Sequence, residues 1–314
     1  MFRTLLVPWD GSPASEHALP LAIGIARRIG ASLRLVRVHV PQEHYQGEAL
    51  LYEGLDHHTR AREQDELDRI TRRVADIAAG VPVTSALVSG AVCDALIEHA
   101  AAVSADLIVM TTHGRGMLSR FWLGSVADEL VRRSPVPLLL CRPTDAPCDL
   151  TSEPLQRRVL IALDGSPAAE SIVEPAVALG SPLDAEYMLL QVVPPAATAE
   201  LAAGTSESEQ VMAAMREELQ AAHERQREAA GAYLESIAAD LRSRSLSVET
   251  RVVDDSRTAV AILDDANQHG ADLIALATRG RGRLARLFLG SVADKVIRGA
   301  GVPVLVRTLS EQVG

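Results

Sequence analysis

The sequence is poor in aromatic residues and cysteine and has no long apolar run. Aromatic residues make up only 3% of the 314 residues, so few side chains are available to stack on nucleic-acid bases, and aliphatic residues must fill the core. No apolar run approaches the roughly 18 residues that a membrane-spanning helix requires. Three cysteines, with no C-x-x-C pair among them, are expected to be ordinary reduced thiols: Cys93, Cys141 and Cys148.

Positive charge is also in deficit, since the net charge is −10. Contacts between basic side chains and phosphates dominate nucleic-acid binding, so we expect no nucleic-acid partner, although a basic loop still allows one small anion to bind. The first residues, MFRTLLVPWDGS, lack the basic region, apolar stretch and small-residue cleavage site of a signal peptide. We therefore expect a cytoplasmic protein with no membrane partner.

One glycine-containing segment occurs twice. Residues 113–132 read HGRGMLSRFWLGSVADELVR, and residues 279–298 read RGRGRLARLFLGSVADKVIR. The beginnings of the two halves match as well, since residues 4–26 and 159–180 each combine an apolar run, Asp-Gly-Ser-Pro and a helical pattern. A repeat of this length predicts a duplicated domain. With a linker rich in Pro, Asp, Ser and Thr, we expect two domains at 1–143 and 157–309 and the linker at 144–156.

Within each half, short apolar strands alternate with helical patterns. This alternation predicts an α/β fold: two tandem, doubly wound, five-stranded parallel sheets, Rossmann-like and flanked by helices on both faces. Asp10 and Asp164 are 154 positions apart, whereas Gly114 and Gly280 are 166 apart, so the second half gains 12 residues between these points. We expect the insertion in the charged helical tract 213–244, where it lengthens a surface helix.

The carboxyl ends of the predicted strands carry the candidate ligand-binding residues, because ligands of doubly wound sheets bind at this edge. Asp10 ends the first strand and Val38 lies near the end of the second. Gly114 and Gly124 allow backbone N–H groups to approach an anion, and Ser125 begins a helix whose N-terminus favours phosphate. The second half repeats this set with Asp164, Val192, Gly280, Gly290 and Ser291.

Each candidate also has an ordinary structural explanation. Ser-Val-Ala-Asp forms a capping box, so Ser125 and Ser291 are equally suited to cap a helix. Asp-Gly-Ser-Pro is common turn chemistry, the glycines fit turns, the loop arginines fit a solvated loop, and the valines fit a strand core. His113 is matched by Arg279, so the position does not require an imidazole.

The charged stretch 60–73 and the neighbouring His57 and His58 are expected to form a solvated helical surface with no metal site. The sequence contains no G-x-x-x-x-G-K-[ST] motif and no G-x-G-x-x-G after its first strand. No Ser/His/Asp arrangement indicates a catalytic centre. We therefore expect no catalytic residues.

These motifs make the chain resemble the universal stress protein family in its tandem, two-domain form. The family's ATP-binding signature is Gly, two residues, Gly, nine residues, Gly, and then Ser or Thr. Residues 111–125 read Thr-x-x-Gly, nine residues and Gly-Ser, and residues 277–291 read Ala-x-x-Gly, nine residues and Gly-Ser. Thr111 and Ala277 replace the first glycine, so close approach of a ligand requires a negative φ at these positions.

The resemblance implies ATP as the ligand of both halves, with Mg²⁺ left open as its companion ion. Adenine and ribose would lie near the aspartate and valine, and the phosphates on the backbone of the loop and of the helix start. The implied binding residues of the first half are Asp10, Gly11, Val38, Thr111, Gly114, Arg115, Gly116, Gly124, Ser125 and Val126. Those of the second half are Asp164, Gly165, Val192, Ala277, Gly280, Arg281, Gly282, Gly290, Ser291 and Val292. Asp255 stands where the first half has Gly90, and would place extra negative charge near the second site.

The resemblance also implies that the last strands of the two domains pair antiparallel, here 136–140 with 302–306. The chain would then form an internal pseudo-dimer, and in addition a homodimer. Such a protein would be a nucleotide-dependent regulator of a stress response and not an enzyme. A slow ATPase or nucleotidyl-transfer enzyme, and a dimerisation scaffold with vestigial loops, are the alternatives.

Overall fold

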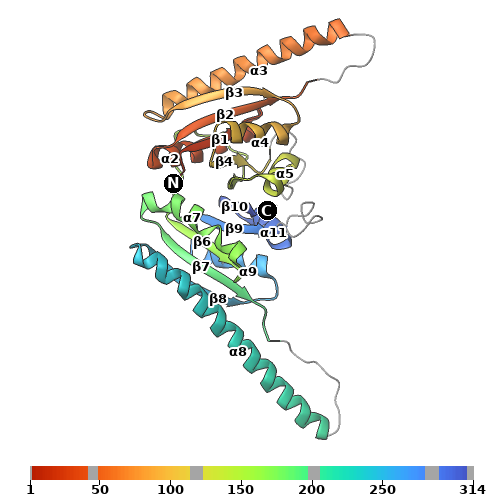
Figure 1. The fold of residues 1–314 in the computed structure, drawn as a ribbon, viewed down its shortest axis with the longest axis vertical. Helices are drawn as coiled ribbons and strands as arrows, with labels where there is room; N and C mark the ends of the chain where they lie inside the picture. The colour runs from red at the N-terminus through yellow and green to blue at the C-terminus, as the bar shows by residue number, and fades with distance from the viewer. Residues whose placement is uncertain (1, 42–48, 114–122, 197–205, 280–289, 310–314) are drawn as a thin grey trace.

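The computed structural model describes residues 2–41, 49–113, 123–196, 206–279 and 290–309. Ten strands in this part of the chain form one sheet in the order β3-β2-β1-β4-β5-β10-β9-β6-β7-β8 (Figure 1). The strands of the first half are β1 (Thr4–Pro8), β2 (Ser32–His39), β3 (Val83–Ser89), β4 (Leu107–Thr111) and β5 (Leu138–Cys141). Those of the second half are β6 (Arg158–Leu163), β7 (Glu186–Val193), β8 (Ser247–Asp254), β9 (Leu273–Arg279) and β10 (Val304–Leu309).

The helices follow the strands in the same order in both halves. The first half has α1 (Pro13–Glu16), α2 (Ala18–Ile29), α3 (Ala49–Ile77), α4 (Val92–Ala102) and α5 (Ser125–Arg133). The second half has α6 (Pro167–Glu170), α7 (Val173–Gly180), the 3₁₀ turn η1 (Ser181–Leu183), α8 (Ser206–Ser243), α9 (Thr258–Gln268) and α11 (Ser291–Gly299). Neighbouring strands within each half are parallel, so the predicted doubly wound α/β class is confirmed. The two predicted sheets are joined into one.

The halves meet where β5 and β10 pair antiparallel, as predicted for 136–140 and 302–306. The opposed residues are Leu138 with Val306, Leu139 with Leu305, and Leu140 with Val304. Because the repeats are offset by 166 positions here, Leu139 and Leu305 are equivalent residues and face each other. The junction is therefore self-complementary, like the two-fold interface of a homodimer, but within one chain.

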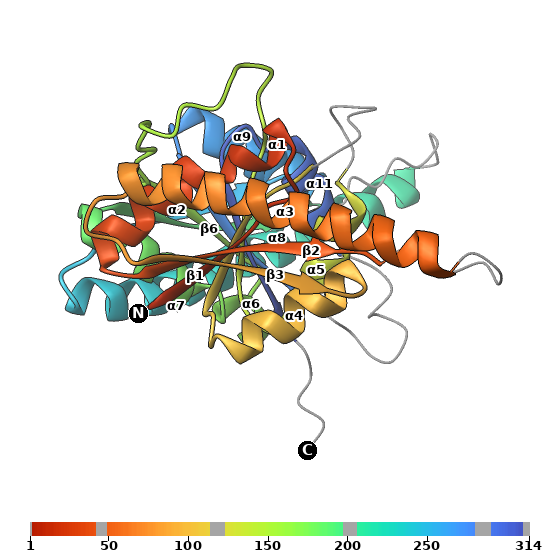
Figure 2. The same ribbon diagram turned by 90° about the horizontal axis from the view of Figure 1, so that it is seen from above.

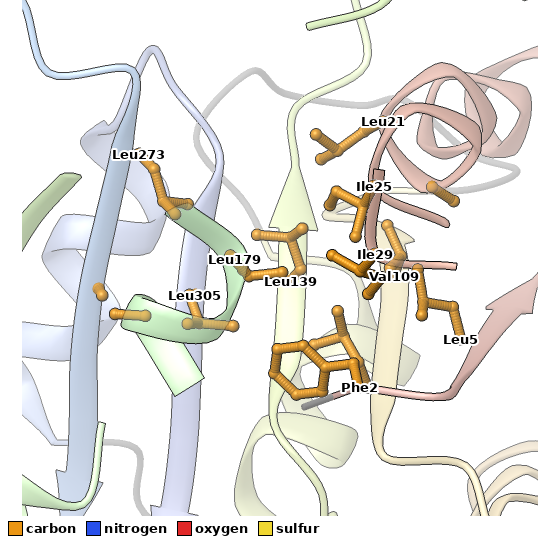
Figure 3. Close-up of a cluster of buried hydrophobic side chains, with 14 of the residues drawn as sticks. Phe2, Leu5, Leu21, Ile25, Ile29, Val109, Leu139, Leu179, Leu273 and Leu305 are labelled. Atoms are coloured by element: carbon orange, nitrogen blue, oxygen red, sulfur yellow. The ribbon is translucent and has the colours of Figure 1, made fainter. Parts of the chain in front are cut away.

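Each face of the sheet carries a hydrophobic core that continues across this junction. On one face α2, α3, α7 and α8 cover the strands, and on the other face α4, α5, α9 and α11 do so. Figure 2 shows α3 and α4 on opposite sides of β2 and β3. Figure 3 shows part of the first core, where Ile25 of α2, Leu139 of β5 and Leu179 of α7 belong to one buried cluster. Since both cores contain residues of both halves, we expect the halves to unfold together.

The two longest helices, α3 and α8, extend past the sheet at opposite ends of the molecule (Figure 1). Helix α8 has 38 residues and α3 has 29, a difference of nine. This difference accounts for most of the 12 residues that the second half gains. The insertion predicted for 213–244 therefore lies in α8 as expected, away from the sheet core.

The connection between β5 and β6, at residues 142–157, contains no helix or strand and packs across α1 and α2. Leu150 is buried in the first core. His17 Nε2 lies 3.0 Å from the carbonyl oxygen of Ala146, and Arg28 donates a hydrogen bond to Pro154 O at 3.2 Å. These contacts attach the connecting segment to the first half.

A carboxylate just before β4 fixes the beginning of β1. Asp106 accepts hydrogen bonds from the backbone N–H groups of Arg3 and Thr4, at 2.8 and 3.2 Å. Asp272, just before β9, does the same for residues 157–158 at the beginning of β6. The repeat thus extends to the side chains that hold the central strands.

Asp106→Ala should lower the free energy of unfolding by about 1–2 kcal/mol, because it leaves two partly exposed N–H groups without their charged acceptor. Denaturant titration followed by circular dichroism measures the change, and Asp272→Ala should give a loss of similar size. Asp65→Ala, which removes an exposed carboxylate of α3, serves as the control. Equal stabilities of Asp106→Ala and this control would contradict the expectation.

Candidate functional site

A cavity of about 440 Å³ opens in the first half at the carboxyl ends of β1, β2 and β4. Its walls also include the beginnings of α4 and α5 and one side of α3. The lining residues are Pro8, Trp9, Asp10, Ser15, Val36, Arg37, Val38, His39, Val40, Asp56, Thr59, Glu63, Val92, Leu96, Met110, Thr111, Thr112, His113, Gly124, Ser125, Val126 and Ala127. This edge is the one at which doubly wound sheets bind ligands, and the volume lies in the range of small-molecule sites.

The cavity brings together six of the ten residues predicted for the first half: Asp10, Val38, Thr111, Gly124, Ser125 and Val126. Gly11 occupies the turn after β1 with a φ of 81°, a left-handed conformation that glycine adopts without strain. The other three, Gly114, Arg115 and Gly116, lie outside the described residues.

Asp10 performs the turn chemistry that was its ordinary explanation, and it also lines the cavity. Its Oδ1 accepts hydrogen bonds from the N–H of Ser12 at 2.9 Å and from the Ser12 hydroxyl at 2.6 Å. The Ser12 hydroxyl in turn accepts from the N–H of Ser15 and caps α1. This chain of bonds fixes the position of the Asp10 carboxylate at the cavity wall.

The beginning of α5 differs from the capping-box alternative. The N-cap residue is Gly124, and no side chain caps the helix, so Ser125 is the first helical residue and not the cap. Gly124 donates its N–H to Thr112 O at 2.8 Å, which joins the two ends of the loop between β4 and α5. The alternative in which Ser125 serves as the N-cap is therefore not observed, and the N-terminus of α5 faces the cavity without a capping side chain.

Thr111 and Ala277, which replace the first glycine of the signature, are strand residues of β4 and β9. Neither has a positive φ, so the side chain of each fits its backbone conformation and the condition stated above is met. The Thr111 hydroxyl donates to His113 O at 2.7 Å and stabilises the chain as it leaves β4.

A buried ionic cluster forms the cavity wall on the side of α3. Arg37 and His39 of β2 are each 2% exposed. Arg37 donates to Glu66 Oε2 at 2.7 Å and to Glu63 Oε1 at 3.3 Å. His39 Nδ1 lies 2.7 Å from Glu63 Oε2, and its Nε2 lies 3.0 Å from Asp56 Oδ1. The two ring nitrogens of His39 thus contact carboxylates on two different turns of α3.

The electrostatics of the cluster follow from these contacts. The hydrogen bond from Arg37 holds the pKa of Glu66 below its usual value. The guanidinium carbon of Arg37 lies 5.4 Å from the centroid of the Trp9 ring, at cation–π distance. Trp9 is buried, and no described group accepts a hydrogen bond from its Nε1.

This cluster corrects the prediction that 60–73 forms only a solvated surface. His57 and His58 are exposed as expected, but Glu63 lines the cavity and Leu67 is buried, because α3 packs one stripe of its surface against the sheet. The sequence did hold a signal. Positions 37 and 39 place an arginine and a histidine in a strand rich in Leu and Val, and a buried charged or polar side chain requires a partner.

The second half repeats the turn and the helix start. Asp164 Oδ1 accepts from the N–H of Ser166 at 3.0 Å, and Gly165 has a φ of 80°. Gly290 is the N-cap of α11 and Ser291 is its first residue, again with no side-chain cap. Val192 and Val292 are partly buried against the second core, and Ala277 against the first. Gly280, Arg281 and Gly282 lie outside the described residues.

The α3-side wall is not repeated. The residues equivalent to Trp9, Arg37 and His39 under the 154-position offset are Leu163, Gln191 and Val193. The second half therefore has neither the arginine nor the histidine of the buried cluster.

Asp255, expected to add negative charge, lies at the carboxyl end of β8 beside β7. Its N–H donates to Val193 O at 3.1 Å. Its carboxylate accepts from the N–H of Arg257 at 2.7 Å and lies 3.6 Å from the guanidinium of that residue. The extra negative charge is thus paired with a cation.

Two further findings concern the described parts of the chain. No group of His, Cys, Asp or Glu side chains there is arranged to hold a metal ion. None of the helices there is both long enough and apolar enough to cross a bilayer.

Comparison with known proteins adds the following. The model of the universal stress protein family matches residues 1–142 and 156–307. A universal stress protein of Thermus aquaticus is 34% identical over 143 residues, which is 45% of this chain and 100% of that protein. One of Mycobacterium bovis is 29% identical over 203 residues, 64% of this chain and 61% of that protein. The crystal structure of a universal stress protein from Archaeoglobus fulgidus has a TM-score of 0.67 at 19% identity, covering 98% of this chain and 97% of that one, a likeness of fold.

Proposed function

Because the chain belongs to the universal stress protein family, we propose that it binds ATP and acts as a nucleotide-dependent regulator of a stress response, without catalysis. The observation that carries the proposal is the convergence of six predicted binding residues on one cavity at the carboxyl edge of the sheet. We also propose a cytoplasmic homodimer of chains whose domains span 1–143 and 157–309, with the linker at 144–156.

The first half offers surfaces suited to a base and a ribose. Val38, Val92, Leu96 and Met110 supply an apolar slot between β2, β4 and α4, which fits a flat base. Asp10 stands at the end of β1, where a carboxylate accepts hydrogen bonds from ribose hydroxyls or an adenine amine. The turn around Ser12 holds it in place.

The N-terminus of α5 is suited to phosphates. Its first N–H groups have no capping side chain, and the helix dipole favours negative charge there. Gly124 and Ser125 line the cavity at this point. Mg²⁺, where present, would enter with the phosphates and be held through them.

We propose a second ATP site at the equivalent edge of the second half, formed by Asp164, Val192, Ala277, Gly290 and Ser291. It shares the aspartate turn and the uncapped helix start. It lacks the buried arginine, histidine and tryptophan of the first half, so we expect the two sites to differ in affinity.

Binding can be tested on the full chain. Mass spectrometry of ligand released from freshly purified protein should detect an adenine nucleotide. ATP added at 100 times the Kd of a site should raise the free energy of unfolding by about 2.7 kcal/mol through that site. Absence of both effects would contradict the proposal.

Asp10→Asn provides the matched variant for the site assignment. The amide oxygen still accepts from Ser12, so the turn should persist, while the charge that faces the ligand is lost. We expect ATP binding at one of the two sites to weaken about tenfold, with unchanged stability of the free protein. Unchanged affinity at both sites would argue against Asp10 as a binding residue.

A further inference from the structure

Arg142 is an exposed residue that follows β5 and lies next to the lining of the first cavity, on the side of the second half. It directly follows β5, whose last residue, Cys141, accepts a hydrogen bond from the N–H of Thr112 at 2.9 Å. Arg142 is therefore beside the Thr112–His113 segment, which lines the cavity. Its Nη2 donates to Arg298 O at 2.9 Å, in the last turn of α11. One side chain thus connects the edge of the first cavity to a helix of the second half.

The pKa of His113 is affected by the positive charges at this edge. Burial lowers its pKa most, and the positive charges of Arg142 and Arg298 lower it further. Its Nδ1 lies 3.0 Å from the Thr112 hydroxyl, and no described group hydrogen-bonds its buried Nε2. The imidazole is thus favoured in its neutral form. The cations whose charge acts on it are Arg142 and Arg298, and Arg298 also donates from Nε to Asp294 Oδ1 of its own helix at 2.7 Å.

The remainder of the cavity is acidic or neutral apart from the buried cluster. Asp10, Asp56 and Glu63 line it, whereas Arg37 and His39 are already bonded to carboxylates of α3. The chain as a whole carries a net charge of −10. A polyphosphate in this cavity would therefore be most stable at the end near the α5 N-terminus and the two arginines.

We propose that Arg142, together with Arg298 of the second half, forms a cationic edge that binds the polyphosphate of the ligand in the first cavity. The inference rests on the proposed function for the adenine part of the ligand, but the anion recognition is independent of it. Because Arg298 belongs to α11, a ligand in the first cavity would then contact a helix of the second half.

The arrangement is not repeated at the second site. Under the 166-position offset, Arg142 corresponds to Thr308 and Arg298 to Arg132. Thr308 is buried, and its hydroxyl donates to Val131 O. The second edge thus has a neutral side chain where the first has a guanidinium, and we expect triphosphates to prefer the first site.

The test uses Arg142→Gln in the full chain, with ATP, adenosine and inorganic tripolyphosphate titrated calorimetrically. We expect the variant to weaken ATP and tripolyphosphate at one site about tenfold and to leave adenosine within about twofold. Arg298→Gln should act in the same direction. Arg142→Lys should recover part of the loss because it retains the charge. Arg133→Gln, which removes an arginine at the other end of α5, is the control and should change none of the three.

The outcomes separate this inference from the proposed function. Unchanged ATP and tripolyphosphate affinity in Arg142→Gln, or an equal loss for adenosine, would overturn the cationic edge while leaving nucleotide binding in place. Arginine-dependent binding of tripolyphosphate by a protein that ignores adenosine would support the edge and overturn adenine recognition. No binding of any of the three by the unmodified protein would overturn both.

Discussion

Leu139→Asp should destabilise the chain by more than about 4 kcal/mol, because it places a carboxylate in a fully buried position at the centre of the sheet. Leu139 is 0% exposed and faces Leu305, its own equivalent in the repeat. It also belongs to the core that continues from one half to the other (Figure 3). The substitution therefore acts on the pairing of the halves as well as on each core.

Differential scanning calorimetry and denaturant titration measure this effect. Leu305→Asp should give a loss of the same size, since the two positions are related by the pseudo-two-fold of the junction. Leu155→Asp adds the same charge at an exposed leucine and should change the stability by less than about 0.5 kcal/mol. A mild effect of Leu139→Asp, or clearly unequal effects at the two equivalent positions, would show that the junction does not hold the halves together.

The two strands of the junction were predictable from the sequence because they depend on local signals. Apolar runs at 136–141 and 302–307 predict strands, and the family resemblance implies their antiparallel pairing. The insertion in the second half was also predictable, since the offset between the repeats changes within one helical tract. The strands and the insertion needed only the order of residues along the chain, whereas the pairing was implied by the family resemblance.

The wall of the cavity on the side of α3 was not predictable in the same way. His39 meets Asp56 and Glu63 across 17 and 24 positions, and Arg37 meets Glu66 across 29. Which carboxylates of a charged helix face the sheet depends on how that helix docks on it, and the sequence pattern does not fix this register. The arginine and histidine in the strand indicate that polar partners are needed, but the sequence does not show which carboxylates of α3 provide them.

The exact start of α5 was also not predictable from the sequence. The capping-box pattern placed the cap at Ser125, but the hydrogen bond from Gly124 to Thr112 holds Gly124 in an extended conformation with a φ of −60° and a ψ of 150°. The cap therefore moves back by one residue. This contact joins the two ends of a loop, and a local motif cannot anticipate it.

Gly124→Ala should weaken nucleotide binding at the first site about tenfold, whereas Gly290→Ala should leave the second site within about twofold. A Cβ on Gly124 would lie 3.1 Å from Thr112 O and 3.6 Å from His113 Cα. Thr112 O already accepts the N–H of Gly124 at 2.8 Å, so it cannot move away without loss of that bond. Overpacking of this kind costs about 1–3 kcal/mol, which falls on the geometry of the helix start where phosphates are proposed to bind.

The second site offers the matched control, because a Cβ on Gly290 meets no described atom within 4 Å. Both substitutions make the same chemical change at the N-cap of equivalent helices, so intrinsic helix propensity cancels between them. Calorimetric titration of ATP into each full-length variant gives the number of sites and their affinities, and circular dichroism confirms the fold. Equal losses for both variants would mean that the glycine serves the ligand and not the loop contact. No loss for either would mean that Thr112 yields to the new methyl group at little cost.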